Sequence, residues 1–173
     1  LLALPNLDPV VLVGHADDRA ELEALLTRLP RAVQLVDGGA RRQDSVAAGL
    51  AALADLGDRC EVVLVHDGAR PFVPLEAIDP LIRAAAEHGC ALLAVPVTDT
   101  LKQAQADDPT LVERTLSRDG LWAAQTPQAF DRARLTERLA AVTAAGLTLT
   151  DEAGMFEAAG LPVHFVEGSP LNF

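Results

Sequence analysis

Short apolar segments recur along the first hundred residues and alternate with segments of helical spacing. The segment 62–65 (VVLV) is β-branched and leaves no room for polar alternation, as is typical of a strand buried on both faces. Between such segments, leucines and valines return every three or four positions, which predicts helices with one apolar face. This alternation predicts an α/β fold with right-handed crossovers and a mostly parallel sheet that carries helices on both faces. The strands are expected at 10–13, 33–36, 62–65, 92–97 and 163–166.

The regular alternation of strands and helices changes after Thr100, where a more polar region begins. Residues 101–108 are mainly polar, and residues 111–116 (LVERTL) alternate in the manner of a hairpin strand that projects from the body. Trp122 and Pro127 then bring the chain back. We therefore expect a single domain over residues 1–173, with a projecting β-arm at about 101–121.

The most informative stretch is 61–71 (EVVLVHDGARP), in which the buried strand breaks abruptly into polar residues. Open α/β sheets bind ligands at the carboxyl ends of their strands, so this break is a candidate site. Asp67 can face a cation, Gly68 allows a ligand close to the backbone, and Arg70 can fork onto a phosphate. The alternative is an ordinary strand-to-turn transition with a surface ion pair.

Further polar residues follow the other predicted strands, at the same edge of the inferred sheet. The two glycines Gly38 and Gly39, placed before a helix, can cradle an anion or a base edge, although an ordinary turn explains them equally well. Thr150 has a structural alternative as well, because an N-cap hydroxyl is fully occupied by its helix. The remaining residues of this set are Arg41, Arg42, Ser45, Asp99, Thr100, Lys102, Arg118 and Thr126.

Arginines, threonines and one aspartate dominate this set of candidate residues. Such an inventory suits the positioning and charge stabilisation of phosphates better than a proton relay. The four histidines lie far apart in the sequence, without the close spacing of a zinc ligand pair.

Composition and charge narrow the classes of function. The formal net charge is −11, which argues against a general nucleic-acid or acidic-membrane surface but leaves a small anionic ligand possible. Cys60 and Cys90 form no CxxC pattern and are expected to be small buried hydrophobes in a reducing compartment. No apolar run reaches transmembrane length, and no signal peptide is recognisable. These features predict a soluble, cytoplasmic protein.

Five segments, taken in order, resemble one enzyme family. They are GGARRQDSV, VHDGARPFV, PVTDTLK, RDGLWAAQTPQAF and TDEAGMFEAAG. Together they are similar to 2-C-methyl-D-erythritol 4-phosphate cytidylyltransferase, an enzyme of the non-mevalonate isoprenoid pathway, and the resemblance covers nearly the whole chain. It implies a Rossmann-like α/β domain whose β-arm builds a homodimer.

The resemblance also implies a reaction and a set of residues. CTP and methylerythritol 4-phosphate would give the CDP-linked alcohol and pyrophosphate by in-line attack of the substrate phosphate, with Mg²⁺ shared among the nucleotide phosphates. Arg118, which would aim the attacking phosphate, and Asp67, on the metal side, are the implied catalytic residues. The implied nucleotide-binding residues are Gly39, Ser45, Asp67 and Gly68. The implied methylerythritol phosphate ligands are Arg70, Thr100, Arg118, Thr126 and Thr150, several of which would reach across the dimer.

The sequence departs from the family pattern at both ends. Family members begin with a strand and a glycine-rich loop that carries an arginine and a lysine, and a further lysine follows their last strand. This chain starts after the first unit and stops at Phe173, before that lysine. Losing one charge-stabilising group commonly costs about 10²-fold in rate. We therefore expect the 173-residue chain to be an inactive, incomplete domain and its full-length parent to be active.

Three alternatives to this assignment remain open at this point. One is a cytidylyltransferase for another polyol phosphate, such as ribitol 5-phosphate, which shares much of the same framework. Another is a nucleotide-binding module that kept the fold and lost the chemistry. The parent protein can also be fused to a cyclodiphosphate synthase.

Overall fold

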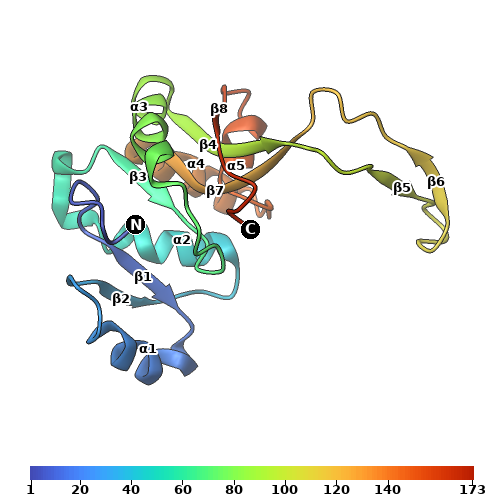
Figure 1. The fold of residues 1–173 in the computed structure, drawn as a ribbon. Helices are drawn as coiled ribbons and strands as arrows, with labels where there is room; N and C mark the ends of the chain where they lie inside the picture. The colour runs from blue at the N-terminus through green and yellow to red at the C-terminus, as the bar shows by residue number, and fades with distance from the viewer.

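The computed structural model describes residues 1–173 except for the side chain of Asp58. Its strands and α-helices are β1 (Val11–Gly14), α1 (Arg19–Leu26), β2 (Gln34–Asp37), α2 (Arg42–Ala51), β3 (Val62–Val65), α3 (Ile78–His88), β4 (Cys90–Pro96), β5 (Lys102–Ala104), β6 (Val112–Thr115), β7 (Trp122–Asp131), α4 (Arg132–Ala144), α5 (Ala153–Ala158) and β8 (His164–Glu167). Short 3₁₀ turns cover Ala16–Asp18, Ala54–Arg59 and Leu75–Ala77. Figure 1 shows a body of sheet and helices from which one hairpin extends to the side. Among the described helices, none is long and apolar enough to cross a membrane.

The sheet is mixed, so the expectation of a mostly parallel sheet was wrong, although the α/β class is confirmed. β1 and β2 form a parallel pair, and the main sheet has the order β3-β7-β4-β8. β7 runs antiparallel to both β3 and β4, whereas β4 and β8 are parallel. The physical reason is the arm: the chain leaves the body at the end of β4 and returns as β7 beside it, so β7 must run the opposite way.

Helices cover both faces of the main sheet, as expected from the apolar spacing. On one face Leu81 and Ala85 of α3 pack against Leu93 and Ala129. On the other face a cluster joins the sheet to α4 and α5, and Phe130 stacks on Phe156 with ring centroids 5.5 Å apart. Alternate residues of β4 feed the two clusters, because neighbouring side chains in a strand point to opposite faces. The strand ends that carry the polar residues are thereby held on a rigid support.

The start of α5 differs from the sequence expectation in a way that bears on the site. Thr150 does not cap this helix; the N-cap is Glu152. The Asp151 carboxylate instead accepts a hydrogen bond from the Gly154 backbone N–H at 3.0 Å. An aspartate serves as well as a threonine in this role, and it leaves the Thr150 hydroxyl outside the helix hydrogen bonds.

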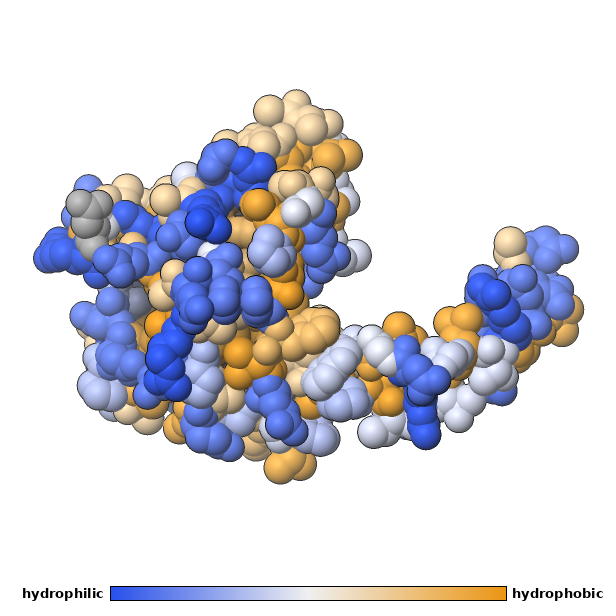
Figure 2. All heavy atoms as spheres, turned by 90° about the horizontal axis from the view of Figure 1, so that it is seen from above, coloured by the Kyte–Doolittle hydropathy of each residue, from blue (hydrophilic) through white to orange (hydrophobic). Residues whose placement is uncertain are grey.

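The projecting hairpin lies inside the predicted arm region. β5 and β6 pair antiparallel and form a separate two-stranded sheet. Figure 2 shows the arm standing away from the body, with hydrophobic residues interspersed among polar ones. Leu111 and Val112 near its tip are 51% and 57% exposed. A two-stranded hairpin is marginally stable alone, so the arm has apolar surface without a partner in the described chain.

Candidate active site

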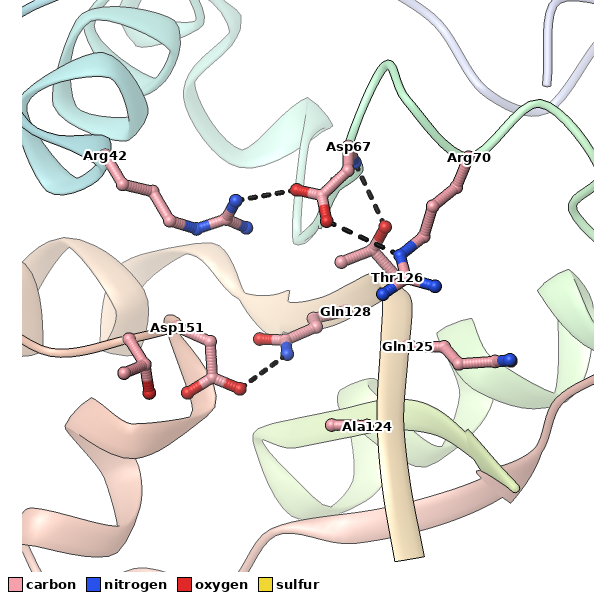
Figure 3. Close-up of a pocket in the computed structure, with 9 residues that line it drawn as sticks. Arg42, Asp67, Arg70, Ala124, Gln125, Thr126, Gln128 and Asp151 are labelled. Carbon is pink, nitrogen blue, oxygen red and sulfur yellow. Dashed lines mark hydrogen bonds and ion pairs between the residues drawn. The ribbon is translucent and has the colours of Figure 1, made fainter. Parts of the chain in front are cut away.

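A polar pocket of about 230 Å³ opens where the loop after β3, the middle of β7 and the segment before α5 meet. Figure 3 shows its side chains converging from these separate segments. Its lining residues are Arg42, Asp67, Arg70, Ala124, Gln125, Thr126, Gln128, Thr150 and Asp151. The structure therefore brings together five of the residues singled out from the sequence, namely Arg42, Asp67, Arg70, Thr126 and Thr150.

Asp67 lies between two arginines. Its Oδ1 accepts a hydrogen bond from Arg42 Nη1 at 2.6 Å, and its Oδ2 is 3.6 Å from Arg70 Nε. Burial by itself would raise the pKa of Asp67, but the hydrogen bond and charge of Arg42, with the charge of Arg70, outweigh it and lower the pKa. Asp67 is thus a carboxylate held in its ionised form. Its neighbour Gly68 is exposed, with no atom within 4 Å of where a Cβ would be.

Thr126 and His66 hold the loop that carries Asp67. His66 Nε2 is 2.9 Å from the Arg70 carbonyl oxygen, which can only accept, so Nε2 carries the proton. The other ring nitrogen, Nδ1, then accepts from the Thr126 hydroxyl at 3.0 Å. Thr126 Oγ1 in turn accepts from the Asp67 backbone N–H at 3.0 Å. Burial lowers the pKa of His66, which favours this neutral ring.

The segment 169–172 does not line the pocket, but it hydrogen-bonds to three of the residues that do. Arg70 Nη1 donates to the Asn172 carbonyl oxygen at 2.8 Å, and Asn172 Nδ2 donates to the Thr126 carbonyl oxygen at 2.8 Å. Gln125 Nε2 donates to the Ser169 carbonyl oxygen at 2.8 Å. These bonds fix Arg70 and β7 against the same segment.

Gly39 and Ser45, two of the expected nucleotide-binding residues, lie together, but neither lines the pocket. The Gly39 backbone N–H donates to Ser45 Oγ at 3.2 Å. A Cβ on Gly39 would lie 2.3 Å from the Asp44 Cβ, so the approach of this loop to α2 requires glycine. The loop between β2 and α2 is therefore tight and fixed in shape.

Thr100 and Arg118 stand at the base of the arm, and neither lines this pocket. Both are exposed, and Arg118 donates to the Thr98 carbonyl oxygen. The structure of one chain thus separates them from the other expected ligands of the alcohol phosphate.

Several pocket residues escaped the sequence reasoning, namely Gln125, Gln128 and Asp151, and Arg42 was seen without a role. Gln128 Nε2 donates to Asp151 Oδ2 at 2.8 Å, and its Oε1 accepts from the Ala153 N–H at 3.1 Å. The one signal available was their position inside QTPQ and TDEAG, which carried the family resemblance. Nothing local in the sequence pairs residues that are this far apart.

The residues present allow a limited role for Mg²⁺. Within the described side chains, no group of three or more His, Cys, Asp or Glu residues is placed to hold a metal ion. Mg²⁺ commonly binds through one or two carboxylates together with substrate phosphates, however, and Asp67 offers one ionised carboxylate in the pocket. The site fits a metal that arrives with a nucleotide, not a metal held by protein ligands alone.

An α/β domain that gathers two arginines, two threonines and an ionised carboxylate in one pocket is suited to binding phosphorylated ligands. A comparison of the sequence with known protein families identifies one family. Residues 1–173 match the family described as "IspD: 2-C-methyl-D-erythritol 4-phosphate cytidylyltransferase". The chain therefore belongs to the 2-C-methyl-D-erythritol 4-phosphate cytidylyltransferase family, whose members are nucleotidyltransferases.

Individual relatives agree with this family assignment. The 2-C-methyl-D-erythritol 4-phosphate cytidylyltransferase of Geobacillus kaustophilus is 44% identical over 165 residues, which cover 94% of this chain and 69% of that protein. The "Bifunctional enzyme IspD/IspF" of Anaeromyxobacter dehalogenans is 46% identical across 100% of this chain, which spans only 44% of the relative. Among solved structures, the cytidylyltransferase of Thermus thermophilus aligns with a TM-score of 0.81 at 32% identity, covering 99% of this chain and 78% of that chain.

Proposed function

We propose that the full-length protein transfers the cytidylyl group of CTP to 2-C-methyl-D-erythritol 4-phosphate and releases pyrophosphate, as a step in isoprenoid precursor synthesis. The observation that carries the proposal is the pocket in which Asp67, Arg70, Thr126 and Thr150 converge from separate segments of the chain. Family membership over residues 1–173 supports the choice of both substrates. The family match does not favour ribitol 5-phosphate or a non-catalytic module.

In the proposed reaction, an oxygen of the substrate phosphate attacks the α-phosphorus of CTP, and the bond to the pyrophosphate leaving group breaks. A phosphate monoester is already an anion near neutral pH, so the step needs no general base. Catalysis then rests on aligning the two anions and on neutralising the charge of the five-coordinate transition state. When bound, Mg²⁺ supplies part of this neutralisation at the nucleotide phosphates.

The proposed nucleotide ligands lie along two loops. Gly39 and Ser45 hold the tight loop before α2 in place. The backbone groups of this loop would read the cytosine edge. Asp67 and Gly68 would lie by the ribose and the metal, since Asp67 is ionised and the space over Gly68 is open. The openness at Gly68 supports close approach of a ligand to the backbone.

The hydrogen bonds of Thr126 refine its proposed role toward the alcohol phosphate. The Thr126 hydroxyl donates a hydrogen bond to His66 and accepts one from the Asp67 N–H, so one lone pair of its oxygen remains to accept a further hydrogen bond. A phosphate oxygen has no proton to donate, whereas a hydroxyl group of the polyol does. We therefore assign Thr126 to a hydroxyl of the substrate, and Arg70 and Thr150 to its phosphate region.

Thr100 and Arg118 are proposed to act from a second copy of the chain, in a homodimer built through the arm. Their position outside the pocket of their own chain and the exposed Leu111 and Val112 support this arrangement.

Cys60 and Cys90 form no disulfide, which supports a reducing compartment such as the cytoplasm.

Substrate choice is tested by measuring pyrophosphate release from the full-length protein with CTP and Mg²⁺. Parallel reactions contain 2-C-methyl-D-erythritol 4-phosphate or ribitol 5-phosphate. We expect release with the first alcohol and little with the second. Preferential release with ribitol 5-phosphate would replace the proposed substrate, and CTP binding without release would favour a binding module.

A further inference from the structure

Glu152 is an unusual residue to find in the interior of this domain. Its side chain is only 1% exposed, and it stands at the N-cap of α5 directly after the pocket residue Asp151. A buried carboxylate is costly unless it is paired with a positive charge and hydrogen-bonded. The partner of Glu152 is Arg42, which precedes it by 110 residues.

Arg42 uses two separate edges of its guanidinium group. Nε and Nη2 form a fork onto Glu152, with Nε to Oε1 at 3.0 Å and Nη2 to Oε2 at 2.9 Å. The remaining nitrogen, Nη1, donates to Asp67 Oδ1 at 2.6 Å. The planar guanidinium group therefore links the buried carboxylate to the pocket carboxylate in a fixed geometry.

Little else restrains the Asp67 carboxylate. The hydrogen bond from the Asp67 backbone N–H to Thr126 fixes the main chain but not the side chain. Arg70 Nε lies 3.6 Å from Oδ2, beyond ordinary hydrogen-bond length, and the adjoining Gly68 is open to solvent. The orientation of Asp67 therefore depends mainly on Arg42, and Arg42 is anchored in turn by Glu152.

We propose that Arg42 is a positioning residue for the transfer reaction. Because the buried Glu152 fixes the Arg42 guanidinium group, Arg42 in turn holds the Asp67 carboxylate toward the nucleotide. The inference rests on the proposed function, because it assigns Arg42 to the same site. It deepens that function because a series of alternating charges, Asp67, Arg42 and Glu152, links the loop after β3, α2 and the start of α5.

Replacing Arg42 by lysine distinguishes a positioning role from simple neutralisation of the Glu152 charge. A lysine ammonium is a single point charge, so it can neutralise Glu152 but cannot form a fork there and reach Asp67 as well. If Arg42 serves only to neutralise the buried charge, Arg42→Lys keeps both stability and activity. If Arg42 positions Asp67, Arg42→Lys keeps most of the stability and loses turnover.

The matched control is Arg19, which also bridges two carboxylates but lies on the surface. Arg19 contacts Asp37 at 2.8 Å and Glu23 at 3.3 Å, and its side chain is 42% exposed. It lies outside the pocket lining. Arg19→Lys is therefore the same chemical change at a bridging arginine away from the site.

The experiment uses the full-length protein and the variants Arg42→Lys, Arg19→Lys, Asp67→Asn and the double variant Arg42→Lys/Asp67→Asn. It measures kcat and KM for CTP, CTP affinity by calorimetry with Mg²⁺ present, and melting temperature. We expect Arg42→Lys to lower kcat/KM for CTP at least tenfold with a small change in melting temperature, while Arg19→Lys matches the unaltered protein. Because Arg42 acts through Asp67, the double variant should lose little more than Asp67→Asn alone in both turnover and affinity.

Failure of this inference is distinguishable from failure of the proposed function. Turnover retained in Arg42→Lys, or losses that add in the double variant, would overturn the positioning role while the proposed function stands. Where Arg42→Lys fails to fold, Glu152→Gln replaces it, since it weakens the anchor and leaves the arginine in place. An unaltered protein that shows no transfer would overturn the proposed function, and this inference with it.

Discussion

At the scale of single residues, the pocket side chains hold one another in place through hydrogen bonds and ion pairs. Asp67 is fixed by Arg42 and by Thr126, and Arg70 is fixed by Asn172. Binding two anions in a geometry suited to group transfer is easier when the side chains are already fixed, because each side chain left free loses conformational entropy on binding. The sequence predicted Asp67, Arg70, Thr126 and Thr150 because they follow strands or lie in distinctive motifs. It could not predict their supports, since Arg42 and Glu152 meet only through the fold.

Thr126 offers a direct test of this support. Thr126→Val keeps the shape but removes the acceptor for the Asp67 N–H and the donor to His66. We expect a loss of about 1–3 kcal/mol in the free energy of unfolding, since a partly buried donor is left unsatisfied. Turnover should fall as well.

Thr126→Ser is the matched control, because it keeps the hydroxyl. Urea unfolding and pyrophosphate release are measured for both variants of the full-length protein. Equal values for valine and serine would contradict the role given to the hydroxyl.

Arg118 is predicted to act on the attacking phosphate and not on nucleotide binding. Arg118→Ala should lower kcat by about 10²-fold or more, as is common for a lost charge-stabilising group. CTP affinity, measured by calorimetry, should stay close to that of the unaltered protein. Intact turnover in Arg118→Ala would remove this residue from the mechanism.

At the scale of elements, the strands that a sequence pattern can predict are the apolar ones. β3 and the core of β4 are short runs of valine, leucine and alanine, and their positions followed from that pattern. β7 was missed as a strand because its buried centre contains Gln125, Thr126 and Gln128. These polar side chains are tolerated inside the fold because other segments bond them, which no local pattern reveals. The mixed sheet follows from this one strand.

The arm is the element for which a partner is predicted. Val112 is 57% exposed in the described chain, so a charged residue there costs nothing in the monomer but is costly in an interface. We expect Val112→Glu to shift the full-length protein from dimer to monomer in sedimentation experiments. Turnover should fall in parallel, since Arg118 and Thr100 would no longer reach the second pocket.

Glu113→Gln serves as the control, because Glu113 is also exposed on β6 but already polar. This variant should keep the oligomeric state of the unaltered protein. A Val112→Glu protein that remains dimeric and active would contradict an arm-built dimer.

At the scale of the whole molecule, an acidic protein presents a pocket that contains two arginines. The net charge of −11 disfavours extended polyanions, and we predict that Arg70 contributes to a local site for small ones. This chain matches relatives of two kinds, single cytidylyltransferases and bifunctional enzymes in which it spans less than half of the length. In both kinds, the same domain carries the resemblance.

The central claim is that the full-length protein transfers the cytidylyl group of CTP to an alcohol phosphate in this pocket and releases pyrophosphate. The most direct measurement follows CTP by ³¹P nuclear magnetic resonance with Mg²⁺, with and without 2-C-methyl-D-erythritol 4-phosphate. We predict that pyrophosphate and a CDP-linked alcohol appear in equal amounts, only when the alcohol phosphate is present, and far more slowly with Arg70→Ala. No reaction in a folded protein, or pyrophosphate formed without the alcohol phosphate, would contradict the account.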